Sequence, residues 1–154
     1  MLRRVNSKFN DYLTIEFRGQ FPYLDAMGLL SQPARDRIEL AGVMESLSDP
    51  TRLAVVAFLA SLPSDANEAR CGVFTAFGSK QNLTYHLAKL REAGVTQARP
   101  EGTSRYISLR REDLEARFPG LLDSIIAAAL SEPERVEMVR LAQEEMRADV
   151  GASV

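Results

Sequence analysis

The clearest periodicity in the chain lies near its middle. Apolar side chains recur there at helical spacing, at Leu83, Leu87 and Leu90. Ser79 is suited to cap the N-terminus of this helix, and Gly94 is suited to end it. The pattern therefore predicts a helix that packs by one apolar stripe and leaves its other face to solvent.

The polar face of this helix lacks acidic residues. None occurs from Ser79 to Arg91, whereas ordinary surface helices mix acids with bases. The face instead carries hydroxyl, amide, phenol and amine groups, on Ser79, Lys80, Gln81, Asn82, Thr84, Tyr85 and Lys89. A helix that reads base edges in the major groove of DNA needs such groups, because carboxylates would be repelled by phosphates. An ordinary amphipathic surface helix is the alternative.

A β-hairpin is predicted directly after this helix. Two short runs, residues 95–100 and 103–109, suit strands that are joined by a glycine-containing turn. Arg99 and Arg105 flank the tip. Such a hairpin forms a wing, and its basic tip is expected to contact the phosphate backbone or an adjacent minor groove. A solvated hairpin with an incidental basic rim is the alternative.

Helices are also predicted before the candidate reading helix. Residues 66–75 are expected to form a short helix and residues 76–78 a turn, which together complete a helix-turn-helix. Asp49 is the predicted N-cap of an earlier helix, with Pro50 at its first position. Pro63 is expected to end that helix.

Three further helices are predicted, over residues 38–47, 119–130 and 133–147. The inward face of the first is expected to contain Leu40, Val43, Met44 and Leu47. The second carries more apolar surface than a small monomer easily buries, so it is expected to form a two-fold interface with the first. The residues predicted in that interface are Leu40, Val43, Leu121, Leu122, Ile125 and Ile126. Packing within one subunit is the alternative.

The order and spacing of these motifs resemble the ArsR-type winged-helix repressors. The resemblance rests on residues 47–53 (LSDPTRL), on residues 79–95, and on Glu101-Gly102 followed by Arg105-Tyr106, and it covers residues 36–130. It implies a mainly α fold with a small β-hairpin wing, that is, a homodimeric winged helix-turn-helix. It also implies a bacterial transcriptional repressor that binds double-stranded operator DNA. In that family, an effector binds the dimer and weakens its hold on the operator.

Charge is divided unevenly along the chain. The sequence has 19 basic and 21 acidic residues, for a net charge of −2. Residues 63–111 carry eight basic and four acidic side chains, a net of +4, whereas residues 112–154 carry four basic and ten acidic ones, a net of −6. Positive potential is therefore expected on the helix-turn-helix and wing. The acidic end is expected to face away from a duplex.

Few residues suit catalysis or metal binding. The chain has one cysteine, Cys71, and one histidine, His86, whereas thiolate metal sites need several soft ligands. No metal site, cofactor or enzyme activity is expected. Cys71 is interpreted as a small buried residue, with a redox switch as the alternative. His86 is interpreted as a packing residue at the edge of the apolar stripe, with a DNA contact as the alternative.

Three segments are predicted. Residues 1–34 form an aromatic-rich extension, which is expected to enlarge the dimer core; a roof over a pocket for a small-molecule effector is the alternative. Its aromatic residues include Phe9, Tyr12, Phe17, Phe21 and Tyr23. Residues 35–130 form the DNA-binding and dimerisation domain, and residues 131–154 a charged helix and tail.

The predicted function is therefore sequence-specific binding of double-stranded DNA by a transcriptional regulator, with an effector other than a thiolate-bound metal. No apolar run is long enough to span a bilayer, and the N-terminus lacks the apolar core of a signal peptide. The protein is therefore expected in the cytoplasm, without a membrane partner. A winged-helix module that binds protein is the alternative, because fold alone does not settle function.

Overall fold

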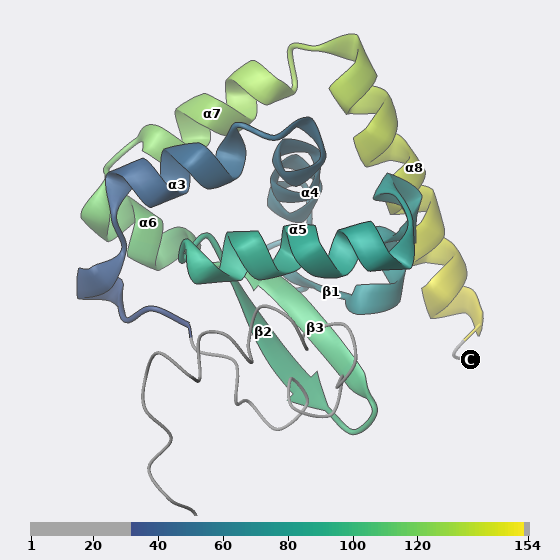
Figure 1. The fold of residues 1–154 in the computed structure, drawn as a ribbon. Helices are drawn as coiled ribbons and strands as arrows, with labels where there is room; N and C mark the ends of the chain where they lie inside the picture. The colour runs from purple at the N-terminus through teal and green to yellow at the C-terminus, as the bar shows by residue number, and fades with distance from the viewer. Residues whose placement is uncertain (1–31, 153–154) are drawn as a thin grey trace, which may run out of the picture.

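A computed structural model describes residues 32–152 of the chain, so the aromatic residues of the predicted N-terminal extension lie outside the described part. The elements in this part are shown in Figure 1 and follow in this order: the 3₁₀ helix η1 (Arg35–Arg37), α3 (Leu40–Leu47), α4 (Pro50–Ala60), β1 (Glu68–Arg70), the 3₁₀ helix η2 (Cys71–Phe77), α5 (Lys80–Glu92), β2 (Thr96–Glu101), β3 (Ser104–Leu109), α6 (Arg111–Arg117), α7 (Leu121–Ala129) and α8 (Pro133–Ala152). The predicted fold class, mainly α with a small β wing, is confirmed.

Helix α4 lies at the centre of the core. It begins as predicted, because the carboxylate of Asp49 accepts hydrogen bonds from the backbone N–H groups of Thr51 (2.9 Å) and Arg52 (3.0 Å), with Pro50 in the first turn. The six consecutive residues 54–59 are all buried. Helices α3, α5, α7 and α8 and strand β3 all contact α4, so it is apolar all round rather than on one face.

The wing belongs to a three-stranded antiparallel sheet with the strand order β1-β3-β2. The hairpin of β2 and β3 turns at Gly102, whose φ of +59° lies in the left-handed region that glycine adopts readily. Strand β1 pairs with the other edge of β3, where Glu68 lies opposite Ser108 and Arg70 lies opposite Tyr106. The predicted hairpin is confirmed, and β1 is an addition to it.

The prediction of a helix over residues 66–75 is wrong for the first half of that range. That part forms β1, and the rest forms the 3₁₀ helix η2 rather than an α-helix. Pairing with β3 satisfies the backbone of this segment and buries Ala69 beneath the sheet, so a tertiary contact overrides local helix propensity. The helix-turn-helix arrangement is kept, with η2 as its first helix and α5 as its second.

The outer helices also differ from the prediction in detail. Ile38 is buried in an extended conformation, so α3 begins only at Leu40. Leu40 and Met44 were expected to face inward, but each is 49% exposed. They lie on the face of α3 next to Val43 and Leu47, which are buried as predicted.

The C-terminal part contains one helix more than the sequence predicted. Helix α6 went unpredicted because Leu114 is the one buried residue in its seven, which leaves no periodic pattern to detect. Helix α7 corresponds to the helix predicted over residues 119–130. Helix α8 begins at Pro133 as predicted but continues to Ala152, and it packs against η2 and α4 through Val139 and Ala142.

The segment that leads into α3 is held by arginines from the region after the wing. The Nη1 atom of Arg110 donates to the carbonyl of Pro33 at 2.5 Å, and the Nη2 atom of Arg117 donates to the carbonyl of Ile38 at 2.8 Å. The side chain of Ile38 in turn lies against Gly94, where α5 ends with a φ of +81°. Helix α5 is therefore followed by a glycine at a crowded position in the core.

We expect that Gly94→Ala lowers the free energy of unfolding by about 1–3 kcal/mol, because a side chain at this φ is strained. Its Cβ atom would also stand 2.7 Å from Cγ1 of Ile38. Gly42→Ala is the matched control, since Gly42 lies within helix α3 with no atom near its potential Cβ. Urea unfolding of both variants tests this, and equal stabilities would contradict the stated role of Gly94.

Candidate nucleic-acid interface

Helix α5 has the boundaries and the packing that its sequence predicts. The hydroxyl oxygen of Ser79 accepts a hydrogen bond from the backbone N–H of Asn82 at 3.4 Å, which caps the helix. Leu83, Leu87 and Leu90 are all buried against the core. Because this stripe is buried, the polar face of the helix points to solvent.

The polar residues of α5 lie on the surface. The exposed set comprises Ser79, Lys80, Gln81, Asn82, Thr84, Tyr85 and Lys89. Gln81, Asn82, Tyr85 and Lys89 share the centre of the exposed face because they recur one turn apart. Thr84 differs from them, since its hydroxyl donates to the carbonyl of Lys80 at 3.0 Å. The accessible donors and acceptors are therefore concentrated on the four central residues.

Tyr85 is the most prominent group on this face. It is 57% exposed, which is unusual for a large aromatic side chain in a folded domain. The Nζ atom of Lys89 lies 5.7 Å from the centroid of its ring, within the range of a cation–π contact. The two side chains therefore present a hydroxyl and an ammonium group close together.

The wing arginines are engaged within the sheet. The Nη2 atom of Arg99 lies 2.5 Å from a carboxylate oxygen of Glu68, and its Nη1 atom lies 2.6 Å from one of Glu101. The guanidinium also stacks over the ring of Tyr106, at 4.9 Å. The hydrogen bonds that Arg99 donates to Glu68 and then to Glu101 hold the pKa of its guanidinium above its usual value. Arg105 is half-buried, and this burial lowers the pKa of its guanidinium.

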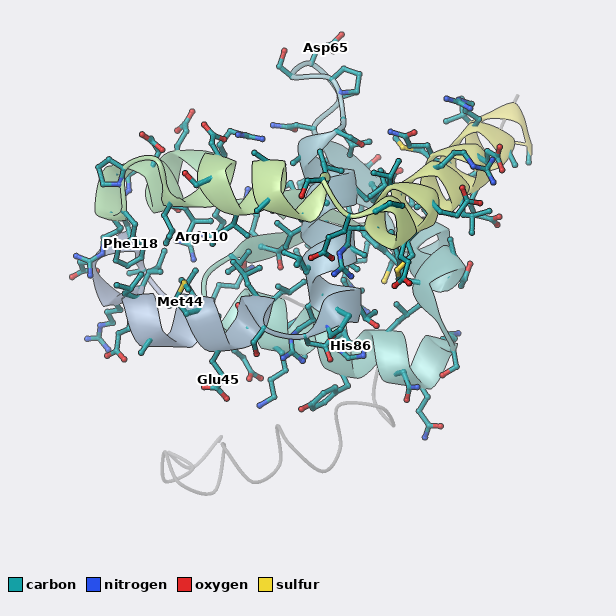
Figure 2. The ribbon with its side chains drawn as sticks, turned by 90° about the horizontal axis from the view of Figure 1, so that it is seen from above. Met44, Glu45, Asp65, His86, Arg110 and Phe118 are labelled. Carbon is teal, nitrogen blue, oxygen red and sulfur yellow. The ribbon has the colours of Figure 1, made fainter. Side chains whose placement is uncertain are left out.

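Helices α4 and α5 meet at a polar contact that we call the α4–α5 junction, formed by Asp49, Arg52 and His86. The Nδ1 atom of His86 lies 3.4 Å from Nη1 of Arg52 and 3.6 Å from Oδ1 of Asp49 (Figure 2 labels His86). The Nε atom of Arg52 also donates to the carbonyl of Ser46, at the end of α3, at 2.5 Å. One arginine thus links α3, α4 and the reading helix.

The junction shifts the pKa of Asp49. Burial alone would raise the pKa of this carboxyl, but the hydrogen bond from the backbone N–H of Arg52 and the charges of His86 and Arg52 lower it overall. His86 was interpreted as a packing residue that bonds a carbonyl. It does pack against the neighbouring helix, but the partners found there are the side chains of Asp49 and Arg52.

Arg52 was not predicted to contact α5. The Asp-Pro-Thr-Arg start of α4 and the single histidine can both be recognised in the sequence. Their contact cannot be recognised there, because His86 and Arg52 are separated by 34 residues in the chain. Only the packing of α5 across α4 brings them together.

The surroundings of Cys71 are unlike those of a redox-sensing thiol. Burial raises the pKa of this thiol, and the charge of Lys80 offsets the effect only in part. The neighbouring cation, Arg70, forms an ion pair with Asp149 of α8 at 3.2 Å, so its charge is already offset. A sensor thiol needs a low pKa and good access, so the position favours a packing role for Cys71.

Residues 32–152 contain no cluster of three or more His, Cys, Asp or Glu side chains arranged to hold a metal ion. In the same residues, no helix is both long and apolar enough to cross a membrane.

Comparison with known proteins is consistent with this interpretation. No protein-family model matches the chain. A curated relative is YceK of Bacillus subtilis (strain 168), described as an uncharacterized HTH-type transcriptional regulator, where HTH denotes helix-turn-helix. The two sequences are 33% identical over 90 residues, which is 55% of this chain and 84% of the relative.

Two substitutions of Asp49 distinguish its role as the N-cap of α4 from the effect of its negative charge. We expect Asp49→Ala to lower the free energy of unfolding by about 1–2 kcal/mol, because the N-cap is lost. Asp49→Asn should retain most of this stability at neutral pH, since its amide oxygen still accepts the backbone hydrogen bonds.

The charge contribution should depend on pH. Because the folded-state pKa of Asp49 is lowered, its carboxylate stabilises the fold above the unfolded value of about 3.9 and loses this effect as the pH falls through the folded value. Urea unfolding of wild type and Asp49→Asn at pH 7 and pH 3 measures this. A difference between the two proteins that is unchanged at pH 3 would refute the assignment.

Proposed function

The chain belongs to the HTH-type transcriptional regulators, and on that premise we propose that it binds double-stranded operator DNA as a homodimer of the ArsR type and represses transcription. The observation that carries the proposal is the exposed, acid-free face of α5, held rigidly on the core beside a β wing. An effector other than a thiolate-bound metal would release the protein from its operator. The alternative, a winged-helix module that binds protein, predicts no salt-sensitive affinity for DNA.

In this proposal α5 enters the major groove and its central residues read bases. Gln81 and Asn82 suit paired hydrogen bonds to adenine, and Lys80 suits guanine or a phosphate. Tyr85 is placed to donate its hydroxyl to a phosphate or to pack on a thymine methyl group. Lys89 beside it serves the backbone, because an ammonium group is a compact and freely orienting phosphate partner.

The wing makes a weaker contribution than its sequence suggests. Three N–H groups of Arg99 already donate to Glu68 and Glu101, so a phosphate would compete with these carboxylates for the guanidinium. Arg105 is half-buried and reaches outward less than the lysines of α5. We therefore assign the main backbone contact to Lys89 and secondary contacts to Arg99 and Arg105.

The proposed dimer uses the face formed by α3 and α7. An apolar hollow there is lined by Val43, Leu47, Leu114, Leu121, Leu122 and Ile125. Leu40 and Met44 project from α3 beside it, and Figure 2 labels Met44 on this helix. Two copies that face each other across a two-fold axis would bury these exposed apolar side chains against the same face of the partner.

The residues expected in this interface have different positions in the monomer. Val43 and Leu122 are buried within their own subunit, where they support the hollow from below. Leu121, Ile125 and Ile126 are partly exposed, so these three, with the exposed Leu40 and Met44, are the residues that we propose touch the partner.

The division between base and backbone contacts can be tested with a duplex selected from a random-sequence pool. We expect Gln81→Ala to lose about 10-fold or more in preference for the selected duplex over scrambled DNA, because one base contact is worth about 1–3 kcal/mol. Lys89→Ala should weaken binding to both duplexes alike and reduce the steepness of the salt dependence by about one phosphate contact.

Fluorescence anisotropy at about 0.1 and 0.2 M salt measures both effects. Arg140→Ala is the matched basic control, because Arg140 lies on α8 between Glu137 and Glu144. Equal losses on both duplexes for both variants would refute the division of labour. Absence of binding by wild type to any duplex at low salt would favour the protein-interaction module.

A charge on the α3–α7 face should disrupt the dimer. We expect Met44→Glu to convert the protein to a monomer without unfolding it, because Met44 is already exposed in the single chain but would be buried between two copies. Sedimentation velocity measures the mass of the variant. Leu141→Glu is the matched control, since Leu141 is 42% exposed on α8, away from this face. A dimer that persists in Met44→Glu would exclude this face.

A further inference from the structure

The single histidine of the chain lies directly behind the surface proposed to read DNA. His86 is mostly buried, with 15% of its side chain exposed. Its ring faces the N-terminus of α4, while the adjacent Tyr85 faces outward on the same helix. The two rings are in edge contact, with centroids 5.5 Å apart and planes at 64°. The ring of His86 is therefore in direct contact with the ring of Tyr85.

The two neighbours of His86 favour different protonation states. In the neutral tautomer that carries its hydrogen on Nε2, Nδ1 can accept a hydrogen bond from Nη1 of Arg52, which lies 3.4 Å away. In the protonated ring, Nδ1 also carries a hydrogen, and Oδ1 of Asp49 lies 3.6 Å away, within ion-pair distance. Arg52 then repels the imidazolium. Protonation of the ring therefore changes the favoured partner of Nδ1 from Arg52 to Asp49.

We propose that His86 is a positioning residue that couples DNA binding to pH: its protonation, favoured by the phosphates of a bound duplex, sets the position of Tyr85 on the reading face. This inference rests on the proposed function, because it needs a duplex at α5. Imidazole is the side chain whose ordinary change of charge lies nearest neutral pH, so the coupling is tested by varying the pH around neutrality.

The charged and titratable groups around the ring determine the sign of the effect. From α4 come the carboxylate of Asp49 and the guanidinium of Arg52, and from α5 come Tyr85 and Lys89. Helix α3 contributes the carbonyls of Ser46 and Glu45, which both accept hydrogen bonds from Arg52. Without DNA, Arg52 opposes a positive charge on the ring, whereas Asp49 favours it.

A bound duplex would change this balance. Phosphates close to Tyr85 and Lys89 would add negative charge near the ring, so the imidazolium would be more stable in the complex than in the free protein. By linkage, the complex takes up a proton, and DNA affinity rises as the pH falls through the imidazole range. A shift of one pKa unit between the two states corresponds to a factor of about 10 in affinity.

The first measurement is the affinity for the selected duplex at pH 8.0 and pH 6.0, at constant ionic strength. For wild type we expect binding at pH 6.0 to be about 3- to 10-fold tighter. His86→Gln retains a neutral hydrogen-bonding side chain but cannot take up the proton, so its affinity should be the same at both pH values. A pH dependence that is unchanged in His86→Gln overturns the proposal.

The wild-type protein supplies an independent test that does not depend on the folding of a variant. Because the chain has one histidine, its imidazole C2 proton gives a single, assignable NMR signal. This signal should titrate at higher pH in the complex than in the free protein, and identical titrations overturn the proposal. If wild type binds no duplex at any pH, the proposed function itself fails, which is a distinguishable outcome.

A second variant separates coupling from simple attraction between charges. Asp49→Asn keeps the cap of α4 but removes the carboxylate that receives the protonated ring. We expect its gain in affinity between pH 8.0 and pH 6.0 to be smaller than that of wild type. A full gain in Asp49→Asn would show that the junction does not take part and would overturn the positioning role.

Discussion

The burial of α4 on all sides is the constraint on which the fold depends. Its six consecutive buried residues, 54–59, lie among α3, α5, α7, α8 and β3, and each of these elements gains its own buried stripe from that contact. The reading helix is one of the covering elements, so its orientation follows from the packing of the core. The α4–α5 junction then fixes the same orientation with polar contacts, beside the cap that starts α4.

The sequence was sufficient for elements whose signals are local. Helix α5 carries its cap and its leucine stripe within sixteen residues, from Ser79 to Gly94, and it could be predicted completely. Strand β1 could not, because it forms by pairing with β3 at partners such as Ser108, which lies 40 positions after Glu68. The exposure of the α5 side chains followed from periodicity. The engagement of Arg99 did not, since its partner Glu68 lies 31 residues away.

Helix α8 gives the helix-turn-helix a support that the winged-helix resemblance does not include. The 3₁₀ helix η2 is short, and such helices have poorer hydrogen-bond geometry than α-helices. Helix α8 lies along η2, and near its C-terminal end Asp149 pairs with Arg70, which also donates to the hydroxyl of Ser104 in the wing. One acidic helix thereby connects the first helix of the motif with the hairpin that follows the second.

The paired carboxylates on Arg99 have a kinetic consequence. Because Glu68 and Glu101 offset the charge of Arg99, this arginine adds less than the lysines of α5 to the long-range field that draws a polyanion toward the protein. In the proposed complex, α5 would contribute more than Arg99 to steering the duplex, and Arg99 would act after contact, when a phosphate competes with Glu68 or Glu101. In that arrangement, α5 would mainly affect the rate of association, and Arg99 would mainly affect the lifetime of the complex.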